Sequence, residues 1–223
     1  MFCIHGNHEE RPEKIDSYKT KRFHNGIVYY EEEYPNILFA KDGEVYDFNN
    51  HKVLVIGGAY SVDKYFRLVR GYNWYESEQP NDKTKSKVRK VLNNLDNKID
   101  IILSHTCPYK YLPREMFLDG IEQSTVDNST EYFLDEIEQT TDYKKWYCGH
   151  YHTNKKIDKM IFMFDEIEEF KWVGSKRVIF ASAKIVGGAS MWHSKALFVK
   201  SLKFRGAFPY PVVSKFLTIS LIS

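Results

Sequence analysis

The sequence has few cysteines and no long hydrophobic run. Cys3, Cys107 and Cys148 are an odd number at wide spacing, which is typical of a reduced intracellular protein rather than of a disulfide framework or a CxxC zinc site. No uninterrupted run of about 18 apolar residues occurs, and no basic segment followed by an apolar one opens the chain. We therefore expect a cytoplasmic protein without a membrane partner.

Acidic residues are missing from the C-terminal part of the chain. Residues 171–223 carry nine Lys or Arg and no Asp or Glu, although the whole chain has 32 basic and 30 acidic residues and a net charge of +2. This change predicts a folded domain at 1–170 and a basic extension at 171–223. Such a composition would suit nucleic acid or an anionic membrane surface, but its basic residues follow no amphipathic period. We expect the extension to lie outside the domain, disordered or loosely docked, with its last stretch, "VVSKFLTISLIS", as a strand, and nucleic-acid binding as the weakest hypothesis.

Short β-rich runs alternate with helical patterns in residues 1–170, which indicates an α/β domain. Strands are predicted in "MFCI", "HKVLVIGG", "DIILSH" and "KKWYCGH", and helices in "EERPEKIDSY", "DKTKSKVRKVLNNLD" and "TEYFLDEIEQ". The segment "NILFAKDGEVYDF" predicts a hairpin around Asp42 and Gly43, because Asp-Gly favours a tight turn. The segment "KMIFMFDEIEEF" predicts a strand that becomes polar.

Polar clusters follow three of the predicted strands. Asn7 and His8 come after "MFCI", His105 after "DIILS", and His150 and His152 after "KWYC". Because ligands gather outside the carboxyl ends of strands in α/β sheets, we expect the clusters to converge. Imidazole and amide donors are suited to Mn, Fe or Zn, so their order and shared context favour a metal-centred site.

Each of these residues has an ordinary alternative. A single histidine is usually a surface or hydrogen-bonded residue, which is the interpretation adopted for His24, His51 and His193, and the string "GNHE" by itself is compatible with a turn and a helix cap. The hypothesis of a metal site therefore depends on the three clusters as a set.

At these residues the sequence resembles the calcineurin-like metallophosphoesterase superfamily. "GNHE", "SH" and "GHYH" are similar to its later motifs, over roughly residues 1–170. The resemblance implies two β-sheets in a sandwich flanked by helices, two divalent metal ions (Mn, Fe or Zn), and hydrolysis of phosphate esters as substrates. It also implies that Asn7, His105 and His150 bind the second metal and His152 the first. His8 would contact the phosphate and protonate the leaving group.

The sequence departs from the family pattern at its start. The DxH and GDxxD motifs that precede "GNHE" in the family, and supply carboxylate ligands, do not occur in it. We therefore expect a domain that lacks its first βαβ elements and is a poor or inactive phosphomonoesterase or phosphodiesterase. The alternative is a non-catalytic remnant or binding module on a degenerate phosphoesterase scaffold.

Substrate contacts are less clearly marked. His5 precedes "GNHE", where the phosphoprotein phosphatase branch commonly has an Arg, and this weakens a protein-phosphatase assignment. Lys64 and Arg67 are candidate phosphate contacts, with Tyr60 and Trp74 as possible stacking surfaces. Solvated charges and core aromatics are the more common role for such residues. The substrate, the native metal and the oligomeric state remain open at this point.

Overall fold

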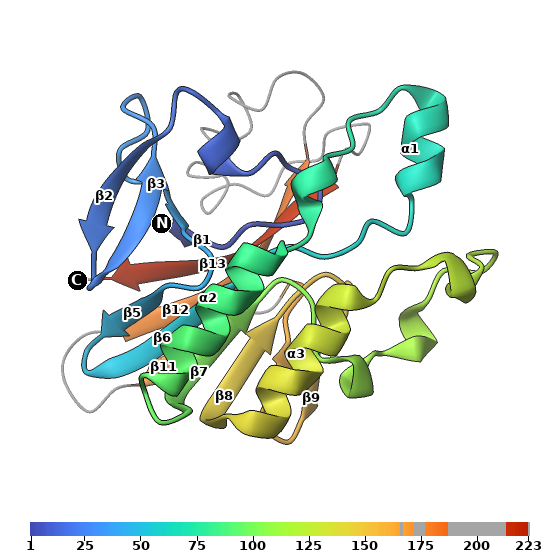
Figure 1. The fold of residues 1–223 in the computed structure, drawn as a ribbon. Coiled ribbons are helices and arrows are strands. Elements are labelled where there is room, and N and C mark those ends of the chain that lie inside the picture. The colour runs from blue at the N-terminus through green and yellow to red at the C-terminus, as the bar shows by residue number, and fades with distance from the viewer. Residues whose placement is uncertain (166, 172–176, 187–212, 223) are drawn as a thin grey trace.

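Two β-sheets packed face to face form the framework, and helices cover the outer face of one of them (Figure 1). The computed structural model describes residues 1–165, 167–171, 177–186 and 213–222. This arrangement is the two-sheet α/β fold that the resemblance implies. Among the described residues, no helix has the length and apolar character needed to cross a bilayer.

The first sheet has seven strands. Their order is β11 (Ile167–Lys171), β12 (Arg177–Val186), β13 (Val213–Ile222), β1 (Phe2–Cys3), β4 (Leu38–Ala40), β3 (Gly26–Tyr30) and β2 (Lys19–Phe23). Strand β1 lies between β4, which runs parallel to it, and β13, which runs antiparallel. The short strand that precedes "GNHE" is therefore an interior strand of this sheet.

The second sheet has six strands. Their order is β5 (Val45–Phe48), β6 (His51–Ile56), β7 (Lys98–Ser104), β8 (Asp142–Cys148), β10 (Met160–Phe162) and β9 (Lys155–Ile157). Strands β6, β7 and β8 run parallel, with Ile56 beside Ser104 and Ser104 beside Cys148. Their carboxyl ends therefore meet at one edge of the sheet.

Three α-helices are described: α1 (Lys64–Arg70), α2 (Asp82–Asn93) and α3 (Ser129–Thr140). Short 3-10 turns lie at Pro12–Lys14, Glu76–Glu78, Tyr109–Tyr111, Arg114–Met116 and Gln123–Thr125. Helices α2 and α3 pack against the second sheet, whereas α1 projects away from both sheets (Figure 1).

The two-residue period of β6 explains how its sheet separates two cores. Val53 and Val55 face the first sheet, whereas Leu54 and Ile56 face the helices. All four side chains are almost completely buried. On the helix side, Val88 and Leu92 of α2 and Leu134 of α3 join the same cluster, as the helical spacing of these residues predicts.

Most of the predicted strands and helices are confirmed, but three local predictions are wrong. The segment before Tyr18 forms only one 3-10 turn, Pro12–Lys14, because Ile15 is already extended. The hairpin around Asp42 and Gly43 is absent, since β4 belongs to the first sheet and β5 to the second. The segment 159–170 likewise supplies two strands, β10 and β11, to different sheets.

Two described strands fall within the predicted basic extension. The strand expected near the end of the sequence is confirmed as β13, which pairs with β1 and with β12. These two strands join the first sheet, whereas we expected an extension outside the domain that is disordered or loosely docked. The division at residue 170 stays a prediction, and His193 and most other residues of 172–212 lie outside the described part.

Candidate functional site

The candidate site lies at the edge where strands of both sheets end. The Gly58 N–H donates to the His5 carbonyl at 2.9 Å, the His105 N–H to the Ile56 carbonyl at 3.1 Å, and the Gly149 N–H to the His105 carbonyl at 3.0 Å. These three bonds connect the loops that follow β1, β6, β7 and β8. The backbone itself therefore brings together the segments that carry the predicted site residues.

Glycine permits the closest of these approaches. A Cβ on Gly57 would lie 2.8 Å from both the carbonyl oxygen and the Cβ of His5, and 2.9 Å from a carboxylate oxygen of Asp42. Such distances are far inside van der Waals contact, so any side chain at this position would separate the loops. The paired glycines that end the predicted strand at 57–58 thus permit the two sheets to meet beside the site.

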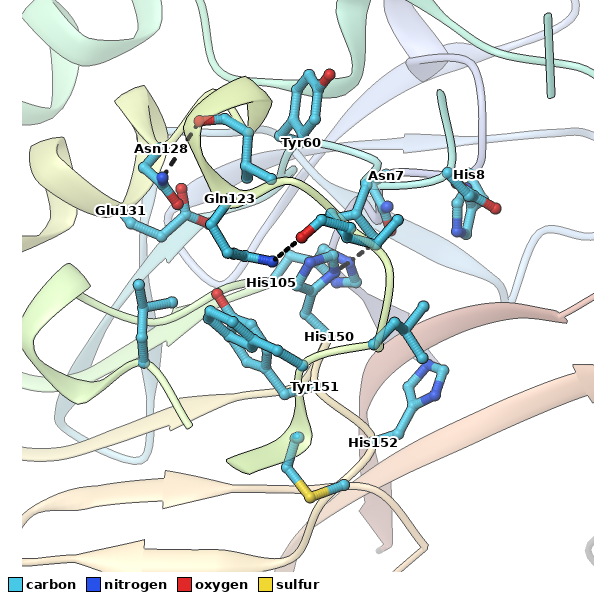
Figure 2. Close-up of a pocket in the computed structure, with 18 residues that line it drawn as sticks. Asn7, His8, Tyr60, His105, Gln123, Asn128, Glu131, His150, Tyr151 and His152 are labelled. Carbon is cyan, nitrogen blue, oxygen red and sulfur yellow. Dashed lines mark hydrogen bonds between the residues drawn. The ribbon is translucent and has the colours of Figure 1, made fainter. Parts of the chain in front are cut away.

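An amide and two imidazoles form the centre of the site (Figure 2). The Asn7 Oδ1 and His105 Nε2 atoms are 2.9 Å apart, and His150 Nδ1 lies 3.2 Å from the same His105 nitrogen. Asn7 is 6% and His105 2% exposed. Possible ligand atoms from three separate loops therefore gather around His105, whose side chain is buried.

The spacing of these atoms fits ligands of a single cation. Donors that bind one cation at about 2.0–2.2 Å, at tetrahedral or smaller angles, lie about 3 to 3.5 Å apart. The two measured separations, 2.9 and 3.2 Å, agree with that geometry. Among the described residues, no group of three or more His, Cys, Asp or Glu side chains is placed to hold a metal ion. Two imidazoles and one amide are the donors present here.

Ser61 fixes the orientation of the Asn7 side chain. Asn7 Nδ2 donates to Ser61 Oγ at 2.9 Å, which turns the amide oxygen towards His105. Ser61 Oγ also lies 3.4 Å from the Asn7 carbonyl oxygen and 3.5 Å from His8 Nδ1. Our sequence analysis missed Ser61, and its only signal was its place shortly after the two glycines.

The imidazoles of the cluster are held neutral. Burial lowers the pKa of His150 to about 3 and that of His105 well below its ordinary value. Burial, followed by the nearby Arg67 charge, lowers the pKa of His8 to about 4, while Asp63 opposes this shift. Neutral imidazole is the form that binds a cation, so burial prepares His105 and His150 as ligands.

His150 and His152 belong to a loop rather than to a regular strand. Strand β8 ends at Cys148, and both residues have a positive φ, 67° and 55°, which is uncommon for residues other than glycine. The His152 ring stacks on Phe164 with ring centroids 5.3 Å apart. The loop therefore presents two imidazoles without the alternation of a strand, and both line the same pocket.

The three predicted clusters converge as expected. Asn7, His8, His105, His150 and His152 all line one pocket of about 250 Å³. Figure 2 shows His8 and His152 on the opposite side of it from Asn128 and Glu131. The fold therefore brings the three clusters together at one place.

Lys64 and Arg67 do not line this pocket. Arg67 Nε donates to Asp63 Oδ2 at 2.8 Å, and Lys64 Nζ lies 4.0 Å from the centre of the Trp74 ring. Tyr60, proposed as a stacking surface, does line the pocket, whereas Trp74 does not. The assignment of Lys64 and Arg67 as substrate contacts stays a prediction, for a substrate that extends beyond the pocket.

Glu131 of α3 is a second residue that our sequence analysis missed. It lines the pocket, is 3% exposed, and its Oε1 accepts a hydrogen bond from Thr106 Oγ1 at 2.7 Å. Burial raises the pKa of this carboxyl group to about 7. The helical pattern of 129–140 placed Glu131 on a helix, but only the packing of α3 shows that it is buried.

Comparison with known proteins gives one family. The model of the calcineurin-like phosphoesterase family matches residues 1–154, which include Asn7, His8, His105, His150 and His152. Searches of curated proteins and of solved structures found no match. The family acts on phosphate esters and generally uses divalent metal ions. Because the match covers more than half of the sequence and includes every residue of the histidine cluster, the chain belongs to the calcineurin-like phosphoesterase family.

Proposed function

We propose that the chain hydrolyses phosphate esters, either monoesters or diesters, with a divalent cation bound by Asn7, His105 and His150. The observation that supports this proposal is the close approach of three possible ligand atoms: His105 Nε2 lies 2.9 Å from Asn7 Oδ1 and 3.2 Å from His150 Nδ1. Mn, Fe and Zn are the cations that suit these donors. His152, in the same pocket, is the candidate ligand of a second cation.

The cation and the protein have separate tasks in this proposal. A divalent cation at these donors would polarise the phosphoryl oxygens and make a water molecule acidic enough to attack phosphorus near neutral pH. His8 contacts the phosphoryl group and gives a proton to the leaving oxygen. The negative charge of a bound phosphate would raise the pKa of His8 and so favour the protonated form that this step requires.

The charges of the donors limit how firmly the cation is held. Asn7 and the neutral imidazoles of His105 and His150 offset none of its charge. Asp63 and Glu131 are the carboxylates that line the pocket among the described residues, and Asp63 Oδ2 already accepts from Arg67. We therefore expect weak metal binding and slow turnover compared with a centre that has carboxylate ligands.

The test combines metal analysis with hydrolysis assays. Bound Mn, Fe and Zn would be measured by elemental analysis, and turnover with an aryl phosphomonoester and an aryl phosphodiester. We expect His150→Ala to lose both metal and turnover. His51→Ala is the matched control, because His51 begins β6 at the end of the strand opposite the site. Equal metal content and turnover in His150→Ala and the wild type would refute the proposal.

A second candidate is a non-catalytic binding module on the same scaffold. It is favoured by one observation: within the described part of the chain, no group of three or more His, Cys, Asp or Glu side chains is placed to hold a metal ion. The same experiment separates the two candidates. Wild-type protein that binds no metal and turns over neither substrate would support the binding module.

A further inference from the structure

One wall of the pocket is apolar and comes from a single segment. The chain between β7 and α3 carries three short 3-10 turns instead of a long helix. Six apolar side chains of this segment line the pocket: Leu112, Met116, Phe117, Leu118, Ile121 and Val126. The polar donors of the metal site and this apolar wall therefore enclose the same space.

Some side chains of the apolar wall are much more exposed than those of the hydrophobic core. Leu118 is 63% and Met116 41% exposed, although large apolar side chains are normally covered. They belong to the pocket rather than to one of the buried clusters. A ligand in the pocket would bury part of this surface, which the folded chain leaves in contact with water.

A buried carboxyl oxygen also indicates a ligand. Glu131 is 3% exposed, and its Oε2 has no hydrogen-bond partner among the described residues. Its other oxygen accepts from Thr106, whose hydroxyl also lies 2.8 Å from the Tyr151 hydroxyl. Since a buried polar atom without a partner costs free energy, a ligand hydroxyl beside Oε2 would be favoured, because a hydroxyl can donate to the carboxylate and accept from the protonated acid.

The dimensions of the pocket limit the size of that ligand. An apolar cavity of about 150 Å³ holds benzene, and drug-sized ligands occupy pockets of about 300 Å³ or more. The volume of about 250 Å³ found here is intermediate between these values. It has room for one ring together with a phosphoryl group.

We propose that the pocket selects phosphate esters of a single-ring, largely apolar alcohol that carries a hydroxyl group. The phosphoryl group would lie beside His8 and His105, the ring against Phe117 and Leu118, and the hydroxyl at Glu131. Figure 2 shows Glu131 across the pocket from His8, as this orientation requires. This inference extends the proposed function and depends on it for the position of the phosphoryl group.

Three small ligands test the inference without turnover. 4-Hydroxybenzylphosphonate has both the ring and a phosphonate group, methylphosphonate lacks the ring, and 4-hydroxybenzyl alcohol lacks the phosphonate. Their affinities would be measured by calorimetry on the full chain, with and without Mn²⁺. A hydrophobic pocket distinguishes even one methylene by about tenfold or more, so we expect the ring to tighten phosphonate binding at least about tenfold.

Two variants locate the effect on the pocket wall. Phe117→Ala should reduce the advantage of the ring at least about threefold, because it removes a large part of the surface that the ring contacts. Phe66→Ala is the matched control, since this side chain is 53% exposed on α1 and does not line the pocket. Leu118→Ala replaces the first variant if Phe117→Ala lowers the melting temperature markedly.

The outcomes separate this inference from the proposed function. If both phosphonates bind only with Mn²⁺ but with equal affinity, the inference is wrong and the proposed function stands. If Mn²⁺ and the phosphonate group have no effect, the proposed function fails. In that case, loss of 4-hydroxybenzyl alcohol binding in Phe117→Ala would still support a binding place for the ring at the apolar wall. If the wild type does not bind 4-hydroxybenzyl alcohol, that binding place is refuted as well.

Discussion

The ion pair between Arg11 and Asp42 lies next to the loops that carry the site. Removing one of its charges tests how much this buried pair contributes to stability. Both side chains are only 7% exposed. The other carboxylate oxygen of Asp42 accepts from the Gly57 N–H at 2.8 Å, and Arg11 Nε donates to the Ser77 carbonyl at 2.6 Å. This pair therefore joins the loop after β1, the loop after β4, the end of β6 and the segment before α2.

The substitution Asp42→Asn removes the charge and keeps the size of the side chain. Its oxygen still accepts from Gly57, but the buried Arg11 guanidinium loses its counterion. Breaking a buried ion pair by removing one partner costs about 3 to 5 kcal/mol, compared with a total stability of about 5 to 15 kcal/mol for a typical domain. We expect the free energy of unfolding to fall by that amount.

Equilibrium unfolding in urea measures this change as a lower midpoint at an unchanged slope. Glu136→Gln is the control, because its pair with Arg89 is exposed, 44% and 45%, and exposed pairs contribute at most about 1 kcal/mol. Equal losses in the two variants would refute the reasoning, since the expected difference comes from burial of the Arg11–Asp42 pair.

Two further predictions concern residues that the tertiary structure added to the site. Ser61→Ala should lower the affinity for Mn²⁺ or Zn²⁺ about tenfold, because the Asn7 amide is no longer held with its oxygen towards the imidazoles. A metal titration measures this affinity, and an unchanged value would show that Ser61 does not orient Asn7. The raised pKa of Glu131, about 7, means that the folded state keeps a proton which the unfolded state loses near pH 4.5. Its contribution to stability is therefore complete below about pH 4.5 and is lost as the pH rises through about 7. The free energy of unfolding of the wild type, relative to that of Glu131→Gln, should fall by at most about 3 kcal/mol between about pH 4.5 and 8. Urea unfolding at each pH measures this difference. A difference that does not change with pH would show that burial does not raise the pKa of Glu131.

Several features were predictable because their signals are local. The apolar run of β6 and the helical spacing of Val88 and Leu92 in α2 are local signals of a strand and of a helix, and both elements form where these patterns occur. The site motifs were also recognisable, because "GNHE" and "GHYH" each lie close behind an apolar run. The carboxyl ends of parallel strands then explain why the motifs meet.

Other features depend on contacts between distant residues. Asp42 and Gly43 have the sequence of a hairpin turn, yet Gly43, with φ of 71°, lies where the chain passes from one sheet to the other. Strand pairing is decided by partners far along the chain, which the dipeptide does not encode. The strand β13 is a further example, since it pairs with β1 more than 200 residues away.

The sequence by itself determined the family, the helices and strands with strong periodicity, and the histidines and asparagine of the candidate centre. Each of these depends on a pattern of neighbouring residues. Only the tertiary structure decided that Ser61 orients Asn7, that Glu131 is buried in the pocket, and that an apolar wall faces the imidazoles. These features arise from burial and from hydrogen bonds between segments that the fold brings together. Residues far apart in the sequence make these contacts, so a local sequence pattern does not predict them.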